Sequence, residues 1–236
     1  MCTVTIRLRT DDVLVTMNRD EQKSRPTEIP AFYWKDKKIT APQDSLRGGT
    51  WMAVNDRGHV ACLLNGYKSH GSNDMSFSKS RGDIIPGLLG TENPRAAAEN
   101  LSAEKYDSFR LVLIQDQQVS IHEWDFLNYH SNALPIQEWY FFTSSTYRQP
   151  EVQEYRQEKF NQWIEKKYVF DGDIPTIHTH YDDERSAFSS MMYRDDACTK
   201  SITQYNASND SHVLNYWPVM DYKPQINQTV KIPVLV

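Results

Sequence analysis

The chain has 236 residues, of which 39% are hydrophobic and 12% aromatic, and this size and composition suit a folded protein with a substantial core. Its formal net charge of -5 leaves no basic surplus to neutralise a phosphate backbone, which argues against nucleic-acid binding. No apolar run approaches the roughly 20 residues of a membrane span. The N-terminus lacks the pattern of a signal peptide, and three cysteines without CxxC spacing fit reduced thiols, so we expect a cytoplasmic protein.

The first 21 residues predict a β-hairpin with a thiol near its start. Two β-type runs, 4–8 and 13–17, flank the segment Thr10-Asp11-Asp12. Acidic residues between two such runs are typical of a turn. Folding this hairpin would bring Cys2 back to the polar segment that follows the second run.

Two registers of this hairpin are open. A two-residue loop at 11–12 would place Cys2 opposite Glu21, and a three-residue loop would place it opposite Asp20. A slip of one residue exchanges the faces of a strand. The first register gathers the apolar side chains on one face with Cys2 and Arg19, so the apolar pattern favours it.

The next segment predicts further strands around a glycine pair. Gly48-Gly49 either allows close approach of the backbone to a ligand or makes a tight entry into a strand, and both interpretations remain open. The polar segment 67–80 is expected to be a mobile loop beside any site. Strands are expected at 31–35, 38–40, 52–54 and 59–64.

The second half of the chain mixes helices and strands. Residues 81–101 are expected to be helical in two pieces, with Pro86 interrupting the first and Asn93-Pro94 starting the second as cap and first-turn proline. Successive hairpins with clustered helices predict an α+β fold with a largely antiparallel sheet, and residues 1–236 are expected to form a single domain. The remaining elements are expected as strands at 109–114, 119–124, 139–143, 199–205 and 211–217, and as helices from Pro150 to about Lys167 and at 182–192.

A candidate metal site lies at His178 and His180, which are followed by Asp182, Asp183 and Glu184. Two histidines two residues apart share one side of a strand and could bind one ion. No third histidine or cysteine at ligand spacing supports this, so a polar loop near the mouth of a site is favoured. We expect neither a metal nor another cofactor.

Cys2 is the strongest candidate for a nucleophile. Removal of Met1 would give Cys2 a free α-amine, with an ordinary pKa of about 7.7–8.0, as its own general base. Arg19 would favour the thiolate, and Asp20 would orient the amine. A second-position cysteine alone is usually a small strand residue, but the hairpin brings the other two groups to it.

Four motifs carry a family resemblance. They are Met1-Cys2-Thr3, Asn18-Arg19-Asp20-Glu21, Gly48-Gly49-Thr50-Trp51 and the segment 55–66, which includes Leu64-Asn65-Gly66. Their order and spacing resemble the NRDE family, also called the transport and Golgi organisation protein 2 family. That family is similar to the N-terminal-nucleophile hydrolases of the bile salt hydrolase and penicillin V acylase type. The resemblance implies a four-layer αββα sandwich of two antiparallel sheets and cleavage of non-peptide amide bonds.

The resemblance also implies roles for individual residues. Cys2 matches the nucleophile, Arg19 and Asp20 match the pair that polarises it, and Asn65 matches an asparagine of the oxyanion hole. Ser144 stands where those hydrolases have a second asparagine, and a hydroxyl is a shorter donor than an amide. Additional candidates are Asn18 and Glu21 and, for a late arginine of that family, either Arg185 or Arg194.

Two functions are therefore expected as alternatives. The first is a cysteine amidohydrolase acting on a small acyl amide. The second is a binding or carrier protein for haem or for an acyl or lipid-type ligand, because eukaryotic members of the resembling family are associated with such handling. The partner is thus a small-molecule acyl amide or a hydrophobic ligand, and the oligomeric state is left open.

Overall fold

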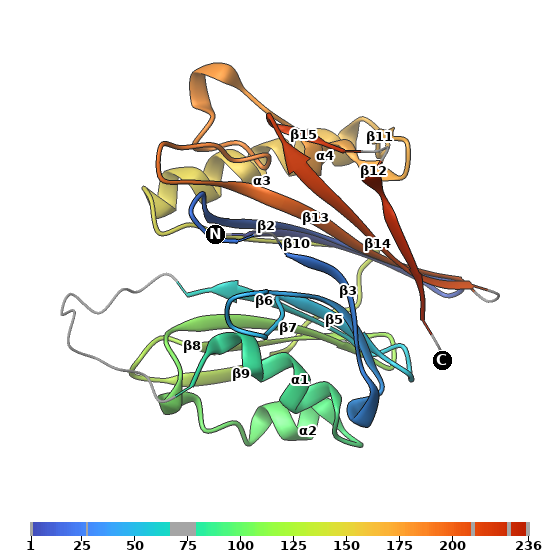
Figure 1. The fold of residues 1–236 in the computed structure, drawn as a ribbon. Helices are drawn as coiled ribbons and strands as arrows, with labels where there is room; N and C mark the ends of the chain where they lie inside the picture. Colours follow the sequence, from blue (N-terminus) through green and yellow to red (C-terminus); the bar gives the residue numbers. More distant parts are fainter. Residues whose placement is uncertain (1, 27, 67–78, 209–210, 226–227, 235–236) are drawn as a thin grey trace.

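The computed structural model describes residues 2–26, 28–66, 79–208, 211–225 and 228–234, and it contains two seven-stranded sheets (Figure 1). The strand pairs of both sheets are antiparallel. Most of the loop expected at 67–80, together with Met1, lies outside the described residues.

The first sheet carries the N-terminus between two other strands. Its order is β10-β1-β2-β13-β14-β15, and β16 pairs with β14. The strands are β1 (Cys2–Arg9), β2 (Asp12–Gln22), β10 (Trp139–Ser144), β13 (Ala197–Ser208), β14 (Ser211–Met220), β15 (Lys223–Pro224) and β16 (Val230–Pro233).

The second sheet follows the chain order β3 to β9. Its strands are β3 (Ile29–Trp34), β4 (Ile39–Gln43), β5 (Met52–Asn55), β6 (Val60–Asn65), β7 (Phe109–Gln115), β8 (Gln118–Trp124) and β9 (Tyr129–Ala133). A small two-stranded sheet joins β11 (Phe170–Asp171) to β12 (Ile174–Pro175).

Helices cover the outer face of each sheet, as Figure 1 shows. Leu14 and Trp139 of the first sheet pack against Phe160 and Trp163 of α3, and a second apolar cluster packs α1 and α2 against the other sheet. This arrangement is the expected four-layer αββα sandwich. The helices are α1 (Ile84–Leu89), α2 (Pro94–Glu99), α3 (Gln149–Glu165) and α4 (Thr176–Thr179), with 3-10 turns η1 (Lys35–Lys37), η2 (Arg81–Asp83), η3 (Ala103–Lys105) and η4 (Asp183–Arg185).

The main core lies between the two sheets. Val4 and Ile6 of β1 meet Cys62 and Leu64 of β6 there, all with 5% exposure or less. Alternate residues of a strand point to opposite faces, so the other face of each strand packs against its helix layer. Among the described helices, none is long and apolar enough to cross a membrane.

The hairpin register differs from both expected ones. Arg9 pairs with Asp12, which leaves Thr10 and Asp11 as the loop and places Cys2 directly opposite Arg19. The register is shifted by two residues from the favoured prediction. A shift of two residues preserves the faces of a strand, so the predicted face is correct although the predicted partner is wrong.

The helix expected at 182–192 is wrong, since only Asp183–Arg185 forms a short 3-10 turn. The backbone beyond it is held by buried side chains instead of a helical ladder. Arg156 donates to the carbonyls of Phe188 and Ser189, and Asn18 donates to that of Ser190. The amide of Met191 donates to the carbonyl of His180 at 3.0 Å, so it does not bond to the carbonyl four residues earlier as an α-helix requires.

Two prolines lie near the starts of α1 and α2. Asn93 caps α2, since its Oδ1 accepts from the amide of Ala96 at 3.1 Å, and Pro94 is the first residue of that helix, as expected. Pro86 does not interrupt a helix but lies in the first turn of α1. A proline is tolerated there because the first amides of a helix have no intrahelical partner.

Candidate functional site

Cys2 begins β1, the strand that lies between β2 and β10. It pairs with Arg19 on one side and with Ser144 on the other. Directly opposed residues of an antiparallel pair share a face, so all three side chains project from the same side of the sheet. The sheet therefore assembles a thiol, a guanidinium and a hydroxyl from three distant parts of the sequence.

The thiol of Cys2 is almost buried, with 5% exposure. Burial raises the pKa of this thiol, and the nearby Asp20 carboxylate acts in the same direction. A hydrogen bond from the Asp20 backbone amide and the charge of Arg19 act against this increase in pKa. In this environment the thiol form is favoured, so a thiolate requires a base that removes the proton.

A cavity of about 140 Å³ opens on Cys2 between the two sheets. Asn65, the last residue of β6, lines the cavity from the second sheet. Within the described residues its side-chain amide has no hydrogen-bond partner, so it is available to a ligand. The other lining residues are Arg19, Asp20, Glu21, Arg25, Asp44, Arg47, Gly49, Thr50, Trp51, Leu63, Ser80, Arg81 and Gly82.

Gly49 lines this cavity, and Gly48 precedes it in the turn. Gly48 has a φ of +73°, and an added Cβ at Gly49 would lie 2.6 Å from the backbone of Gly82. The amide of Thr50 donates to the carbonyl of Gly82 at 3.1 Å. The glycine pair therefore permits close approach of two backbone segments of this chain.

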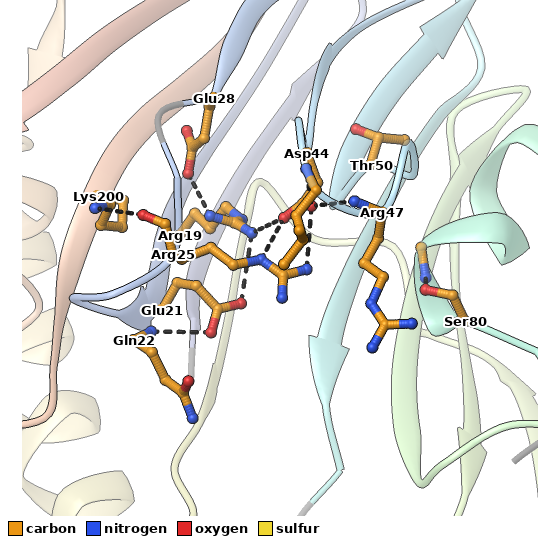
Figure 2. A network of polar contacts seen from close by, with 12 residues as sticks. Arg19, Glu21, Gln22, Arg25, Glu28, Asp44, Arg47, Thr50, Ser80 and Lys200 are labelled. Carbon is orange, nitrogen blue, oxygen red and sulfur yellow. Dashed lines mark hydrogen bonds and ion pairs between the residues drawn. The ribbon is translucent and has the colours of Figure 1, made fainter. Parts of the chain in front are cut away.

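Arg19 lies at the centre of a carboxylate–arginine cluster made of Arg19, Glu21, Arg25, Glu28 and Asp44 (Figure 2). Its guanidinium contacts Glu28, lies 2.6 Å from Asp44 and 3.4 Å from Glu21. Burial acts against the charge of Arg19, but these three carboxylates outweigh it and raise its pKa. The cation is thus fixed in place and partly neutralised beside the thiol.

Asp44 ties the cluster to the second sheet, as Figure 2 shows. Arg25 donates to both carboxylate oxygens of Asp44, at 2.9 and 3.0 Å. Burial disfavours the charge of Asp44, but the hydrogen bonds from Arg25 and from the Arg47 amide outweigh it and lower its pKa. Because Asp44 also binds Arg19, one ionised side chain links the two sheets at the cavity.

Asp20 points away from this cluster into the helix layer, where Arg156 of α3 is its partner. Both side chains are 0% exposed, with Nη2 of Arg156 3.7 Å from Oδ2 of Asp20. Thr199 donates to Oδ1 at 2.6 Å. Burial raises the pKa of Asp20 and lowers the pKa of Arg156, and each charge opposes the shift of the other.

Arg156 also holds the strand that carries the nucleophile candidate. It donates from Nη1 to the hydroxyls of Thr3 and Thr143, at 3.1 and 2.9 Å. Thr143 in turn donates to the backbone carbonyl of Cys2 at 3.2 Å. Sequence reasoning missed Arg156. Its four-residue spacing from Val152 and Phe160 places it on the buried stripe of α3, and that spacing was the available signal.

The late arginines proposed from the sequence lie outside the cavity at Cys2, although the charge of Arg194 acts to lower the pKa of Asp20. Arg185 lines a separate cavity of about 610 Å³ beside α3 and stacks over Tyr155. Arg194 binds Asp196 at 2.7 Å and lies over the ring of Tyr147. Neither arginine lines the cavity at Cys2.

Asn18 supports the helix layer. Its amide donates to the carbonyls of His178 and Ser190, so its Oδ1 accepts from Nδ1 of His178 at 2.6 Å. Nε2 of that histidine then accepts from the hydroxyl of Thr5 at 2.7 Å. Burial lowers the pKa of His178 to about 3, so the imidazole is neutral and fully hydrogen-bonded.

His178 and His180, the two histidines of the candidate metal site, have different hydrogen-bond partners. His178 is buried under the first sheet, whereas His180 bonds to the hydroxyl of Tyr155 at 3.1 Å. They lie at the end of α4 rather than on a strand, so the spacing argument for one shared ion was wrong. No group of three metal-binding side chains was found among the residues that the structure describes.

Comparison with solved structures identifies the fold. A mutant of the conjugated bile acid hydrolase from Clostridium perfringens matches with a TM-score of 0.55 and 12% identity, over 99% of this chain and 92% of that chain. Penicillin V acylase from Agrobacterium tumefaciens matches with a TM-score of 0.57 and 10% identity, over 99% of this chain and 86% of the acylase chain. The protein therefore has the fold of the N-terminal-nucleophile hydrolases.

The family follows from the sequence. A family model described as Transport and Golgi organisation 2 matches residues 1–223, and the chain belongs to this family. The human Transport and Golgi organization protein 2 homolog is 25% identical over 127 residues, which cover 51% of this chain and 44% of the human protein. The resemblance drawn from the four motifs is thereby confirmed.

Proposed function

We propose that this protein is a cysteine amidohydrolase that acts on a small, non-peptide acyl amide. One observation carries the proposal: Cys2 pairs with Arg19 and Ser144 and opens on a cavity that Asn65 lines from the facing sheet. The fold shared with acyl amide hydrolases supports it. Three free cysteines support a cytoplasmic location.

In the proposed reaction, removal of Met1 frees the α-amine of Cys2, which accepts the thiol proton. The sulfur attacks the acyl carbon, and the amide of Asn65 stabilises the oxyanion. Collapse of the tetrahedral intermediate breaks the C–N bond, and the proton leaves with the amine. Water then hydrolyses the thioester and returns the thiol.

The surrounding residues would prepare this step. Burial disfavours deprotonation of the Cys2 thiol. The α-amine of the same residue would offset this effect by accepting the thiol proton. Arg19, held by its carboxylates, supplies positive charge on the same face. Ser144 is 2% exposed and its hydroxyl has no hydrogen-bond partner among the described residues, so it is a candidate second donor.

Turnover of chromogenic acyl anilides tests the proposal. We expect hydrolysis by the wild-type protein and none by Cys2→Ala, and a decrease of about 100- to 1000-fold for Asn65→Ala. Cys198→Ala is the matched control, since Cys198 is a half-buried thiol that does not line the cavity. Equal rates for the wild type and Cys2→Ala would reject the proposal.

The second candidate is a binding protein for haem or for an acyl or lipid-type ligand. The raised pKa of the Cys2 thiol favours it, because a buried neutral thiol is a poor nucleophile. A serine in place of a second amide donor favours it as well. Saturable binding of an acyl anilide with no release of aniline over many hours would support this function against the first.

A further inference from the structure

Arg47 lines the cavity and has no carboxylate partner among the residues that the structure describes. It lies in the turn between β4 and β5, and its backbone amide donates to Asp44 at 2.8 Å. Its guanidinium has no hydrogen bond or ion pair within the described part of the chain. Figure 2 shows it extending away from Asp44, on the side of Ser80.

The carboxylate of Asp44, three residues before Arg47, is already occupied. Asp44 accepts from Arg19, twice from Arg25, and from the amides of Leu46 and Arg47. An ionised carboxylate offers about four lone-pair sites, so these bonds saturate it. The positive charge of Arg47 is therefore available to a molecule in the cavity.

A second arginine lies on the same wall. Arg81, in η2, uses Nη1 for the carbonyl of Ser108 at 2.8 Å and for Asp107 at 3.2 Å. The structure gives its Nη2 and Nε no partner among the described residues. The close contact of Gly49 with Gly82 joins the two backbone segments that carry Arg47 and Arg81.

We propose that Arg47 and Arg81 bind a carboxylate group of the substrate, so that the acyl amide is an anion. This inference rests on the proposed function, because it assumes that the scissile amide lies at Cys2. A guanidinium matches a carboxylate with two parallel N–H donors, and two guanidinium groups on one wall select for negative charge. Glu21 lies in the carboxylate–arginine cluster, where it accepts from Arg19 and from the amide of Gln22.

Binding to the Cys2→Ala variant tests this subsite without turnover. N-butanoylglycine is compared with N-butanoylglycinamide, and glutaranilic acid with pentananilide, which places the carboxylate on either side of the amide. We expect the acid of at least one pair to bind about fivefold or more tightly than its neutral partner, and added salt to reduce the difference. No preference for the acid in either pair overturns the inference.

Second substitutions in the Cys2→Ala variant test whether Arg47 causes the preference for the acid over the neutral probe. Arg47→Gln should abolish most of it, and Arg47→Lys should retain part of it, because the charge remains without the planar fork. Arg148→Gln is the control, as Arg148 is an exposed arginine outside this cavity. An unchanged preference in Arg47→Gln contradicts the assignment.

Turnover separates the two proposals. If wild-type protein hydrolyses acidic and neutral probes at equal rates, the amidohydrolase function stands and the carboxylate subsite is rejected. If the acids bind preferentially but no probe is hydrolysed, Arg47 and Arg81 bind the carboxylate of a ligand that is not a substrate, and the amidohydrolase function is rejected.

Discussion

At the scale of single residues, the buried pair of Asp20 and Arg156 joins β2 to the helix layer behind the site. Arg156→Met would remove the buried cation that lies 3.7 Å from the carboxylate of Asp20. Breaking such a pair costs about 3–5 kcal/mol. We expect a decrease of this size in the free energy of unfolding at neutral pH, measured by denaturant titration.

The matched control for that substitution is Gln157→Met, which changes an exposed neighbour on the same helix. It should alter stability by about 0.5 kcal/mol or less. A cost below about 1 kcal/mol for Arg156→Met would show that the pair does not hold β1 and β2 to the helix layer.

His178 makes stability depend on pH. Its pKa is about 3 in the folded chain, against an ordinary value of about 6.5, so between these values the unfolded chain binds a proton that the folded chain does not. The contribution of His178 to the free energy of unfolding is therefore fully present above pH ~6.5. It falls by about 1.4 kcal/mol for each pH unit below that value.

Unfolding titrations of wild type and His178→Gln between pH 7 and 4 measure this contribution. All groups other than His178 are common to both proteins, so the difference in slope belongs to His178. We expect the variant to show the shallower dependence. Parallel curves would contradict the assignment of a neutral, buried imidazole.

At the scale of elements, the glycines of the cavity wall allow a sharp comparison. A Cβ at Gly49 would lie 2.6 Å from the backbone of Gly82, whereas a Cβ at Gly87, within α1, meets nothing within 4 Å. We expect Gly49→Ala to destabilise by about 1–3 kcal/mol and to reduce ligand binding. Gly87→Ala should stabilise by about 0.5–1 kcal/mol. Equal effects in thermal unfolding would contradict this account of the wall.

Local patterns in the sequence predicted most of the elements but not their partners. Alternating apolar runs identified β1, β2, β7 and β8, and Pro150 marked the start of α3 within one residue. The hairpin register was wrong by two positions, because Thr10-Asp11-Asp12 offers more than one turn. Strand β9, with the sequence Tyr-His-Ser-Asn-Ala, has no apolar pattern and forms by pairing with β8.

In the candidate site, too, single residues were predicted from the sequence but some of their partners were not. Cys2, Arg19 and Asn65 belong to motifs that can be read in the sequence, and the structure brings them to one cavity. The partners of Glu28 and Arg156 could not be predicted from the sequence, because the packing of β2 between two layers sets their contacts with Arg19 and Asp20.

At the scale of the whole molecule, we propose that the described chain is one cooperative unit, because the main core draws side chains from both sheets. Fluorescence and circular dichroism should report a single coincident unfolding transition. Leu64→Ala, in that core, should lower stability by about 2–5 kcal/mol, whereas Leu127→Ala, at an exposed site, should have little effect. Two separate transitions would contradict one cooperative unit.

The central claim, that Cys2 acts as an N-terminal nucleophile, depends on the peptide bond between Met1 and Cys2. Intact mass spectrometry of the protein, expressed without an N-terminal tag, tests this claim most directly. We predict a mass that lacks one methionine, so that Cys2 carries the free α-amine. A mass that retains Met1 would contradict it, because the thiol would then have no general base of its own.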